Sequence, residues 1–477
     1  MATPYWIAGE PKLGDDPLEV FSPYDGRAVG RTTLAVPQDV EAAIATAHQA
    51  QAACASAPAH VRAAALDHVS RELSTRVEEI AAILTAESGK PLKWARIEVA
   101  RASSTFRWGA EEARRWSGSV QRLDTDPAAT GRMALVRRAP RGPVLGIAPF
   151  NFPLNLVAHK VAPAIAVGTP IVLKPAPATP LTALLLGEIL AETDLPKGAW
   201  SILPVTNDVA SVMVTDPRLP VVSFTGSVPV GWAIRDAVPR KHVTLELGGN
   251  AAVVVAPDQD KDDLAHAAAR IATFAMYQAG QSCISVQRVF AHREIAEQLT
   301  TKIVEAVQQL GTGDPADDNT DVGPLIDEVA ACRVEVWVEE AVAAGATLLT
   351  GGTRSGAAYT PTVLTDVPRD AKVSREEIFG PVVVVEAVDS IDEAFDRVND
   401  SRFGLQAGVF THNLQLAFRA AHELEVGGVV IGDVPSFRAD QMPYGGLKDS
   451  GTGREGVRAA MEDLTEERVL VLTGITL

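Results

Sequence analysis

The sequence lacks the features that would place it in several common classes of protein. Its three cysteines among 477 residues cannot build a disulfide framework, and so few are typical of a reducing compartment, so we expect a cytoplasmic protein. The longest apolar runs, such as 161–173, are interrupted by proline and glycine, and the N-terminus has no basic start before an apolar core. We therefore expect neither a membrane span nor a signal peptide.

Basic clusters and metal-ligand spacings are also scarce. The net charge is −17, whereas a nucleic-acid surface needs clustered lysine and arginine, so we expect no nucleic-acid partner. The nine histidines and the cysteines are scattered without the spacing of metal ligands, so we expect no metal site.

The hydrophobic content, 47% of all residues, is ample for two or more compact domains. Residues 37–117 carry apolar residues at helical spacing, which predicts a helical region. From residue 141, short apolar runs alternate with helix-like segments, and a second block of this kind begins at residue 251. This alternation is typical of parallel sheets with crossover helices, so the sequence predicts an α/β protein with two such blocks.

Two segments with strand character lie outside both blocks. Residues 119–138 have a strand-turn-strand pattern around Pro127 and Gly131, and residues 468–477 are rich in β-branched and leucine residues. We expect them to pair with each other or with a neighbouring molecule, because an exposed strand edge needs a cover.

Cys283 is the residue that most strongly suggests chemistry. It follows Gly280, Gln281 and Ser282, which make a poor apolar-core neighbourhood, and it comes after a carboxylate motif that begins at Glu246. A cysteine attacks carbonyl carbons at neutral pH because part of it is thiolate and sulfur is nucleophilic. The pair predicts covalent acyl chemistry, with a small buried hydrophobe as the alternative. Cys54 and Cys332 lie in helix-like stretches, and we interpret both as structural.

A glycine-containing turn over residues 224–231 is a candidate phosphate site. It follows an apolar run and precedes a helix-like one, and a helix N-terminus offers free N–H groups and a favourable dipole to a pyrophosphate. The spacing does not match G-x-G-x-x-G, so by itself the turn indicates little. Lys174 ends another expected strand, where parallel sheets bind ligands, although a solvated lysine is the alternative.

Seven motifs, taken together and in order, resemble those of the NAD(P)-dependent aldehyde dehydrogenase superfamily over essentially the whole chain. They are Pro149-Phe150-Asn151-Phe152-Pro153, Lys174-Pro175, Phe224-Thr225-Gly226-Ser227, Glu246-Leu247-Gly248-Gly249, Gly280-Gln281-Ser282-Cys283, Glu377-Ile378-Phe379-Gly380-Pro381 and Pro443-Tyr444-Gly445-Gly446-Leu447-Lys448. The resemblance implies oxidation of an aldehyde with NAD or NADP as cofactor.

The resemblance also implies an architecture. Residues 1–120 and 141–248 would form a Rossmann-like coenzyme domain, and residues 249–452 an α/β catalytic domain. Residues 121–140 and 463–477 would form a small β extension for oligomerisation. We therefore expect a homodimer or homotetramer.

Individual roles follow from the same resemblance. Cys283 would be the nucleophile that forms a thiohemiacetal and then a thioester, with the oxyanion held by the Asn151 amide and the Cys283 N–H. Glu246 would activate the hydrolytic water, and Lys160 and Glu455 would relay its proton. The cofactor would contact Phe150, Lys174, Pro177, Gly226, Ser227, Gly231, Leu247, Glu377 and Phe379.

One departure from the family bears on the cofactor. Many members that prefer NAD carry a glutamate where this chain has Pro177. Its loss removes a hydrogen-bond acceptor and a charge that would repel a 2′-phosphate, so NADP becomes admissible. Asp208 could favour NAD, and the preference stays open.

Three positions of the family's substrate funnel are polar or cationic here: Arg101, His159 and Arg438. Because a guanidinium binds carboxylate or phosphate in a fork geometry, we expect a small polar or anionic aldehyde, either a hydroxyaldehyde or a semialdehyde. The pattern resembles the branch with lactaldehyde and phosphonoacetaldehyde dehydrogenases, although Ser282 weakens the phosphonate interpretation. For Arg101 the alternative is an ion pair with Glu98 at i−3.

Two other functions compete with this interpretation. A CoA-acylating semialdehyde dehydrogenase would pass the thioester to CoA, but such members generally lack the base that Glu246 provides. A catalytically silent binding or structural homologue is disfavoured by the presence of Cys283, Glu246 and Asn151 together.

Overall fold

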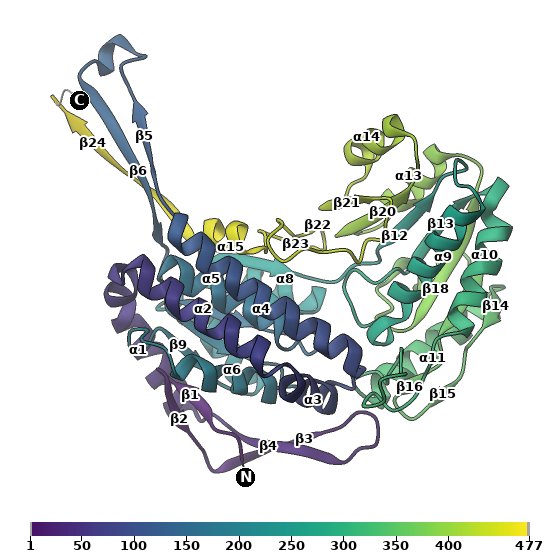
Figure 1. Ribbon diagram of the computed structural model, residues 1–477, viewed down its shortest axis with the longest axis horizontal. Coiled ribbons are helices and arrows are strands. Elements are labelled where there is room, and N and C mark those ends of the chain that lie inside the picture. The colour runs from purple at the N-terminus through teal and green to yellow at the C-terminus, as the bar shows by residue number, and fades with distance from the viewer. Residues whose placement is uncertain (1, 475–477) are drawn as a thin grey trace.

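The computed structural model describes residues 2–474 of the chain and contains two large sheets, each with its own helices (Figure 1). The first sheet has the order β2-β1-β9-β8-β7-β10-β11-β23. Its central strands are parallel: β7 (Val144–Ile147), β8 (Ile171–Lys174), β9 (Trp200–Ile202), β10 (Val221–Thr225) and β11 (His242–Glu246). The edges are β1 (Tyr5–Ile7), β2 (Glu10–Lys12) and β23 (Gly451–Thr452).

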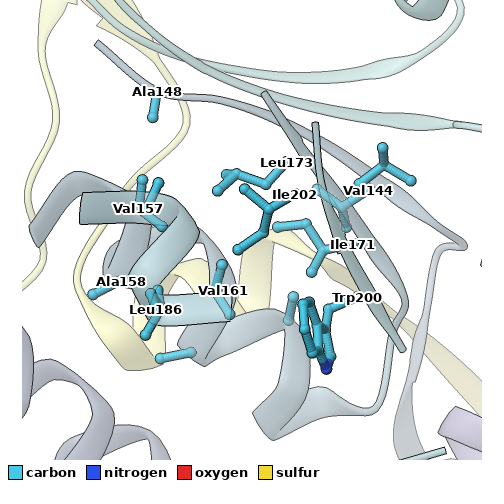
Figure 2. Close-up of a cluster of buried hydrophobic side chains, with 14 of the residues drawn as sticks. Val144, Ala148, Val157, Ala158, Val161, Ile171, Leu173, Leu186, Trp200 and Ile202 are labelled. Atoms are coloured by element: carbon cyan, nitrogen blue, oxygen red, sulfur yellow. The ribbon is translucent and has the colours of Figure 1, made fainter. Parts of the chain in front are cut away.

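Two groups of helices accompany this sheet: four that precede its parallel strands in the chain and four that connect them. The expected helical region consists of α1 (Pro37–Ser56), α2 (Ala59–Thr75), α3 (Val77–Ser88) and α4 (Leu92–Arg115). The crossovers are α5 (Asn155–Val167), α6 (Leu181–Ala191), α7 (Asn207–Thr215) and α8 (Val228–Ala237). Figure 2 shows the core between strands β7 to β9 and helices α5 and α6, where Ile171, Leu173 and Trp200 meet Val157 and Val161.

The second sheet has the order β14-β17-β18-β13-β12-β20-β21. All neighbours are parallel except β14 (Thr347–Thr350) and β17 (Thr362–Thr365). The other strands are β12 (Ala252–Val255), β13 (Arg288–His292), β18 (Val382–Val388), β20 (Gln406–Phe410) and β21 (Gly428–Ile431). The helices are α9 (Lys261–Met276), α10 (Arg293–Gln308), α11 (Glu328–Ala343), α12 (Lys372–Arg375), α13 (Ile391–Asn399) and α14 (Leu414–Glu423). The prediction of two α/β blocks is confirmed.

A three-stranded arm projects from the first block at the upper left of Figure 1. It contains β5 (Ser119–Arg122), β6 (Arg132–Pro140) and β24 (Thr465–Thr473). Strand β24 runs antiparallel to β6 over nine residue pairs, so the two segments with strand character do pair with each other. The last three residues of the expected strand 463–477 lie outside the described part of the chain.

One short hairpin was not expected from the sequence. It consists of β3 (Asp16–Phe21) and β4 (Ala28–Leu34) and precedes α1. The C-terminal segment contains α15 (Val457–Asp463) before β24. Cys54 is buried, as a structural residue should be, but Cys332 is exposed and packs in no core. Within residues 2–474 no helix is long and apolar enough to cross a bilayer.

Candidate active site

A cavity of about 710 Å³ is lined by residues from both sheet blocks and from the C-terminal segment. This volume is typical of small-molecule and cofactor sites. Most of the residues singled out in the sequence meet here: Arg101, Phe150, Asn151, Lys174, Pro177, Gly226, Ser227, Glu246, Leu247, Cys283, Glu377, Phe379, Arg438 and Glu455. His159, Lys160 and Gly231 do not line this cavity.

Cys283 follows a tight turn between α9 and β13. The turn contains a 3-10 helix, η2 (Tyr277–Gly280), in which Gln278 and Ala279 both have φ of 53°, a strained conformation for residues with a side chain. A Cβ at Gly280 would come within 2.0 Å of the carbonyl oxygen of Gly380, so only glycine fits. The Cys283 Sγ lies 3.0 Å from the Tyr444 hydroxyl. Burial raises the pKa of the thiol to about 12, so the resting group is protonated.

Asn151 brings the two blocks together at the thiol. It lies after β7, and its Nδ2 donates a hydrogen bond to the Gln281 carbonyl at 3.1 Å, while Gln278 Nε2 donates to the Asn151 carbonyl. The following helix α5 is held by Glu98, whose Oε1 accepts the N–H of Leu154 at 2.9 Å and of Asn155 at 3.1 Å. The Asn151 amide is therefore fixed beside the loop that carries Cys283.

Glu246 ends β11 and has no hydrogen-bond partner for either carboxylate oxygen among the described residues. Burial, together with the negative charge of Glu455, raises its pKa well above the ordinary value, although Arg438 acts in the opposite direction. A buried carboxyl without partners is free to exchange a proton with a molecule in the cavity.

Lys160 and Glu455 lie behind Glu246 in a hydrogen-bonded group. Lys160 Nζ donates to Ser223 Oγ at 3.0 Å, Thr225 Oγ1 at 2.7 Å and Glu455 Oε1 at 3.4 Å. Burial lowers the pKa of Lys160. The pKa of Glu455 is lowered despite its burial, because the charges of Lys160 and Arg438 stabilise the carboxylate. The structure thus brings both expected relay residues next to each other.

The three expected substrate residues form one cluster around Asp440. Arg101 Nη2 lies 2.8 Å from Asp440 Oδ1, and His159 Nε2 lies 3.1 Å from the same oxygen. Arg438 Nη2 contacts the His159 ring at 3.4 Å and donates to Glu455 Oε2 at 3.1 Å. Arg101 and Arg438 line the cavity, whereas His159 is fully enclosed behind them.

The alternative partner expected for Arg101 is wrong. Glu98 does not pair with Arg101, because its carboxylate binds the buried Lys90 and the N-terminus of α5. Asp440, which takes the place of Glu98, was missed. It lies two residues after Arg438, so the only signal in the sequence was a carboxylate within a short charged run.

The cofactor side of the cavity fits a dinucleotide. Helix α8 begins directly after Ser227, and Gly226 and Ser227 line the cavity, so the helix N-terminus lies where it can meet a phosphate. A Cβ at Gly226 would come within 2.6 Å of the Phe224 ring, so glycine is needed for this packing. Lys174 is buried, and within the described residues its ammonium has neither a hydrogen bond nor an ion pair. Burial lowers its pKa to about 8. A buried cation without an anionic partner suits a phosphate or ribose.

The opposite end of the cofactor side holds the other expected residues. Glu377 accepts the Gly249 N–H at 3.0 Å, and its burial raises its pKa to about 7. The Phe150 and Phe379 rings meet edge to face at 6.0 Å. Gly231 packs on Leu247, since a Cβ would come within 2.4 Å of its Cδ2, and so shapes the wall without lining it. The cavity is also lined by residues of α7 and α8 that lie outside the quoted motifs and were not predicted as cofactor contacts: Asn207, Ala210, Ser211, Val214, Val230 and Ile234.

Comparisons with known proteins agree with this geometry. The model of the family described as "Aldehyde dehydrogenase family" matches residues 6–470. The chain is 43% identical to a 3-sulfolactaldehyde dehydrogenase of Priestia aryabhattai over 98% of this chain and 97% of that protein. It is 35% identical to a lactaldehyde dehydrogenase of Methanococcus maripaludis over 98% of this chain and 100% of that protein.

Two solved structures are similar throughout. Aldehyde dehydrogenase 21 from Physcomitrella patens, in complex with the reaction product succinate, superposes with a TM-score of 0.97 at 45% identity, covering 99% of this chain and 98% of that chain. The glyceraldehyde-3-phosphate dehydrogenase GapN from Methanocaldococcus jannaschii, complexed with NADP, gives a TM-score of 0.92 at 35% identity, covering 97% of this chain and 100% of that chain.

Proposed function

Because the chain belongs to the aldehyde dehydrogenase family and is an NAD(P)-dependent enzyme that oxidises aldehydes, we propose that its substrate is a small anionic aldehyde, either a semialdehyde or a hydroxyaldehyde. One observation carries this narrower statement: two guanidinium groups, Arg101 and Arg438, line the same cavity as Cys283. Arginine binds carboxylate and related anions through paired N–H groups.

The similar proteins support this choice. The relatives with the names 3-sulfolactaldehyde and lactaldehyde dehydrogenase are named for small polar aldehydes. The Physcomitrella patens structure contains succinate, a dicarboxylate. 3-Sulfolactaldehyde and succinate carry a negative charge that a guanidinium in the cavity would bind, whereas lactaldehyde is polar and neutral.

In the proposed reaction, the Cys283 thiol passes its proton to Glu246 or to water, and the thiolate attacks the aldehyde carbon. The negative charge that develops on the aldehyde oxygen would be held by Asn151 Nδ2 and the Cys283 N–H, two donors fixed in advance by the fold. Lys174, Gly226, Ser227, Glu377 and Phe379 would hold the NAD(P) cofactor. When bound, it supplies the acceptor for the hydride that the oxidation removes.

Glu246 would then serve as the base that activates water for hydrolysis of the acyl group on Cys283. Its raised pKa suits this role, since a base is most effective when its pKa lies near the working pH. The proton would leave through Lys160 and Glu455, which are hydrogen-bonded to each other and both contact the Thr225 hydroxyl. The overall reaction converts the aldehyde, water and the oxidised cofactor into the carboxylate, the reduced cofactor and protons.

A comparison of two arginine variants tests the substrate class. The ratio of kcat/KM for succinic semialdehyde to kcat/KM for butanal would be measured for wild type, Arg101→Gln, Arg438→Gln and the surface control Arg419→Gln. Loss of a charge-assisted hydrogen bond corresponds to roughly a 10- to 100-fold fall in this ratio. An unchanged ratio in both cavity variants would contradict the anion site.

Two further arms of the same assay test the rest of the mechanism. Cys283→Ala should abolish reduction of either cofactor. A rate that requires CoA would indicate the acylating function, and cofactor binding without reduction of any aldehyde would indicate a silent homologue.

We also propose that the enzyme accepts NADP readily. Between Lys174 and α7 the cavity is lined by Ala176, Pro177, Asn207 and Ser211, without a carboxylate. Asp208, which could have favoured NAD, does not line it. Pro177→Glu should raise the KM for NADP at least about tenfold by charge repulsion and leave the KM for NAD similar or lower. An equal change for both cofactors would contradict the proposal.

The assembly proposed for the chain is a homodimer or homotetramer in the cytoplasm. The proposed domains are a coenzyme domain of residues 1–120 and 141–248, a catalytic domain of residues 249–452, and an oligomerisation extension of residues 121–140 and 463–477. Strand β24 exposes Val469, Leu470 and Val471 by 60%, 56% and 50% on an open sheet edge, which a second copy would cover. Light scattering tests this, and a stable monomer would contradict it.

A further inference from the structure

Tyr444 is a buried phenol whose hydroxyl points at the nucleophile. Tyr444 is 4% exposed, and its hydroxyl oxygen lies 3.0 Å from Cys283 Sγ. Within the described residues this hydroxyl has no other hydrogen-bond partner. The backbone of Tyr444 is fixed by a two-way bridge with Glu455, with N···O distances of 2.9 and 2.7 Å, so the phenol is held in place independently of the sulfur.

A cation lies against the face of the same ring. The Arg438 Cζ is 3.9 Å from the Tyr444 ring centroid, and Glu455 holds this guanidinium from the other side at 3.1 Å. Arg438 Nε is buried without a partner, so part of its charge is not compensated by a direct hydrogen bond. A positive charge on the ring face draws electron density from the ring, which makes the phenol a stronger hydrogen-bond donor.

We propose that Tyr444 is a catalytic residue whose O–H donates to the sulfur of Cys283 and stabilises the thiolate. The inference rests on the proposed role of Cys283 as nucleophile. The phenol keeps its own proton, and the proton of the thiol leaves to Glu246 or to water. Arg438 thereby gains a second task, because it strengthens the donor in addition to facing the substrate.

The chemistry of the pocket makes such a donor necessary. Burial disfavours the charged thiolate and raises the pKa of Cys283, and the hydrogen bond from Tyr444 acts against this effect. Burial also raises the pKa of the Tyr444 phenol well above its ordinary value, so the hydroxyl carries its proton throughout the neutral range. The opposite arrangement, in which the thiol donates to the phenol oxygen, would stabilise the thiol and delay ionisation.

The same cavity provides a matched control. Tyr277 also lines the cavity, but its hydroxyl bonds to Ser282 Oγ at 2.8 Å and not to the sulfur. Tyr277→Phe and Tyr444→Phe each delete one hydroxyl that contacts the loop carrying the nucleophile. Only Tyr444→Phe removes the contact with Cys283 itself.

The experiment measures the rate of Cys283 alkylation by iodoacetamide as a function of pH, with mass spectrometry to separate Cys283 from Cys54 and Cys332. Since a hydrogen bond to a charged group is lost, the pH of half-maximal rate should rise by about one to two units in Tyr444→Phe. The limiting rate at high pH should be unchanged. In Tyr277→Phe the midpoint should stay within about 0.3 unit of wild type.

Three outcomes would overturn the proposal. A lower midpoint in Tyr444→Phe means that the thiol is the donor, and an unchanged midpoint means that the contact does not stabilise the thiolate. An equal rise in Tyr277→Phe means that general polarity is responsible. Thermal unfolding and circular dichroism check that the variants are folded. If Tyr444→Phe does not fold, Arg438→Gln gives the second test, since loss of the ring cation should also raise the midpoint and an unchanged midpoint would refute the proposal.

The alkylation assay contains neither aldehyde nor cofactor, so it separates this inference from the proposed function. Retained aldehyde oxidation in Cys283→Ala would remove the nucleophile role without altering the alkylation profile. Conversely, an unchanged alkylation midpoint in Tyr444→Phe leaves the role of Cys283 intact and removes only that of Tyr444.

Discussion

Replacing Lys90 with methionine removes one half of an ion pair that lies entirely inside the protein. The side chains of Lys90 and Glu98 are each 1% exposed, and Lys90 Nζ also lies 4.2 Å from the Phe152 ring centroid. Breaking a buried pair costs roughly 3–5 kcal/mol because the remaining charge is left without compensation. Since Glu98 keeps two backbone N–H donors, we expect the lower end, about 3 kcal/mol.

Urea unfolding of Lys90→Met measures this loss. The control is Arg419→Gln, which breaks two exposed pairs, with Glu423 and with Asp392. Because Arg419 is 46% exposed, the two pairs together should contribute no more than about 1 kcal/mol. Because Glu98 holds the helix that follows Asn151, Lys90→Met should also lower kcat/KM, whereas the control should not. Equal urea midpoints for the two variants would refute the assignment of Lys90 as the compensating charge.

Three further variants test other parts of the site. Glu246→Gln keeps the shape of the side chain but removes the base, so stopped-flow absorbance should show about one reduced cofactor per active site and then turnover at least about 10²-fold slower; an undiminished steady rate would contradict this role. The hydrogen bond from His159 and the charge of Arg101 hold the pKa of Asp440 well below its usual range despite burial, so its carboxylate stabilises the fold fully above about pH 4 and less as the pH falls. Asp440→Asn should therefore lower the thermal midpoint at pH 7, with a difference that narrows towards pH 3; a constant difference would count against this linkage. Gly280→Ala should be far more damaging than Gly432→Ala in thermal unfolding, because both have positive φ but only the first meets backbone, at 2.0 Å; similar losses would show that the clash is relieved.

The strands of the parallel sheets could be predicted from local sequence because a strand buried on both faces needs a continuous apolar run. The runs at 171–173 and 252–255 are examples, and both lie in strands here. The hairpin β3–β4 was missed because few of its residues are buried and its strands carry no such run.

The candidate nucleophile Cys283 and the candidate base Glu246 could be predicted because each lies in a specific local motif. Their partners were not, because those contacts join distant parts of the chain. Arg101 and Asp440 are 339 positions apart, and no spacing rule connects them. The alternative pair of Arg101 and Glu98 was wrong for the same reason. Glu98 instead accepts backbone N–H groups at the N-terminus of α5, which is distant in the sequence.

The return of the C-terminal segment to the first sheet has a consequence for how the protein is made. Strand β23 pairs with β11, α15 packs on α5, and β24 closes the arm on β6. Strand β11 leaves the ribosome about 200 residues before β23, which corresponds to roughly 10–40 s at 5–20 residues per second. Throughout that interval β11 lacks its outer neighbour β23, and β6 pairs with β5 but lacks β24. This is therefore the period in which the nascent chain depends most on chaperone protection.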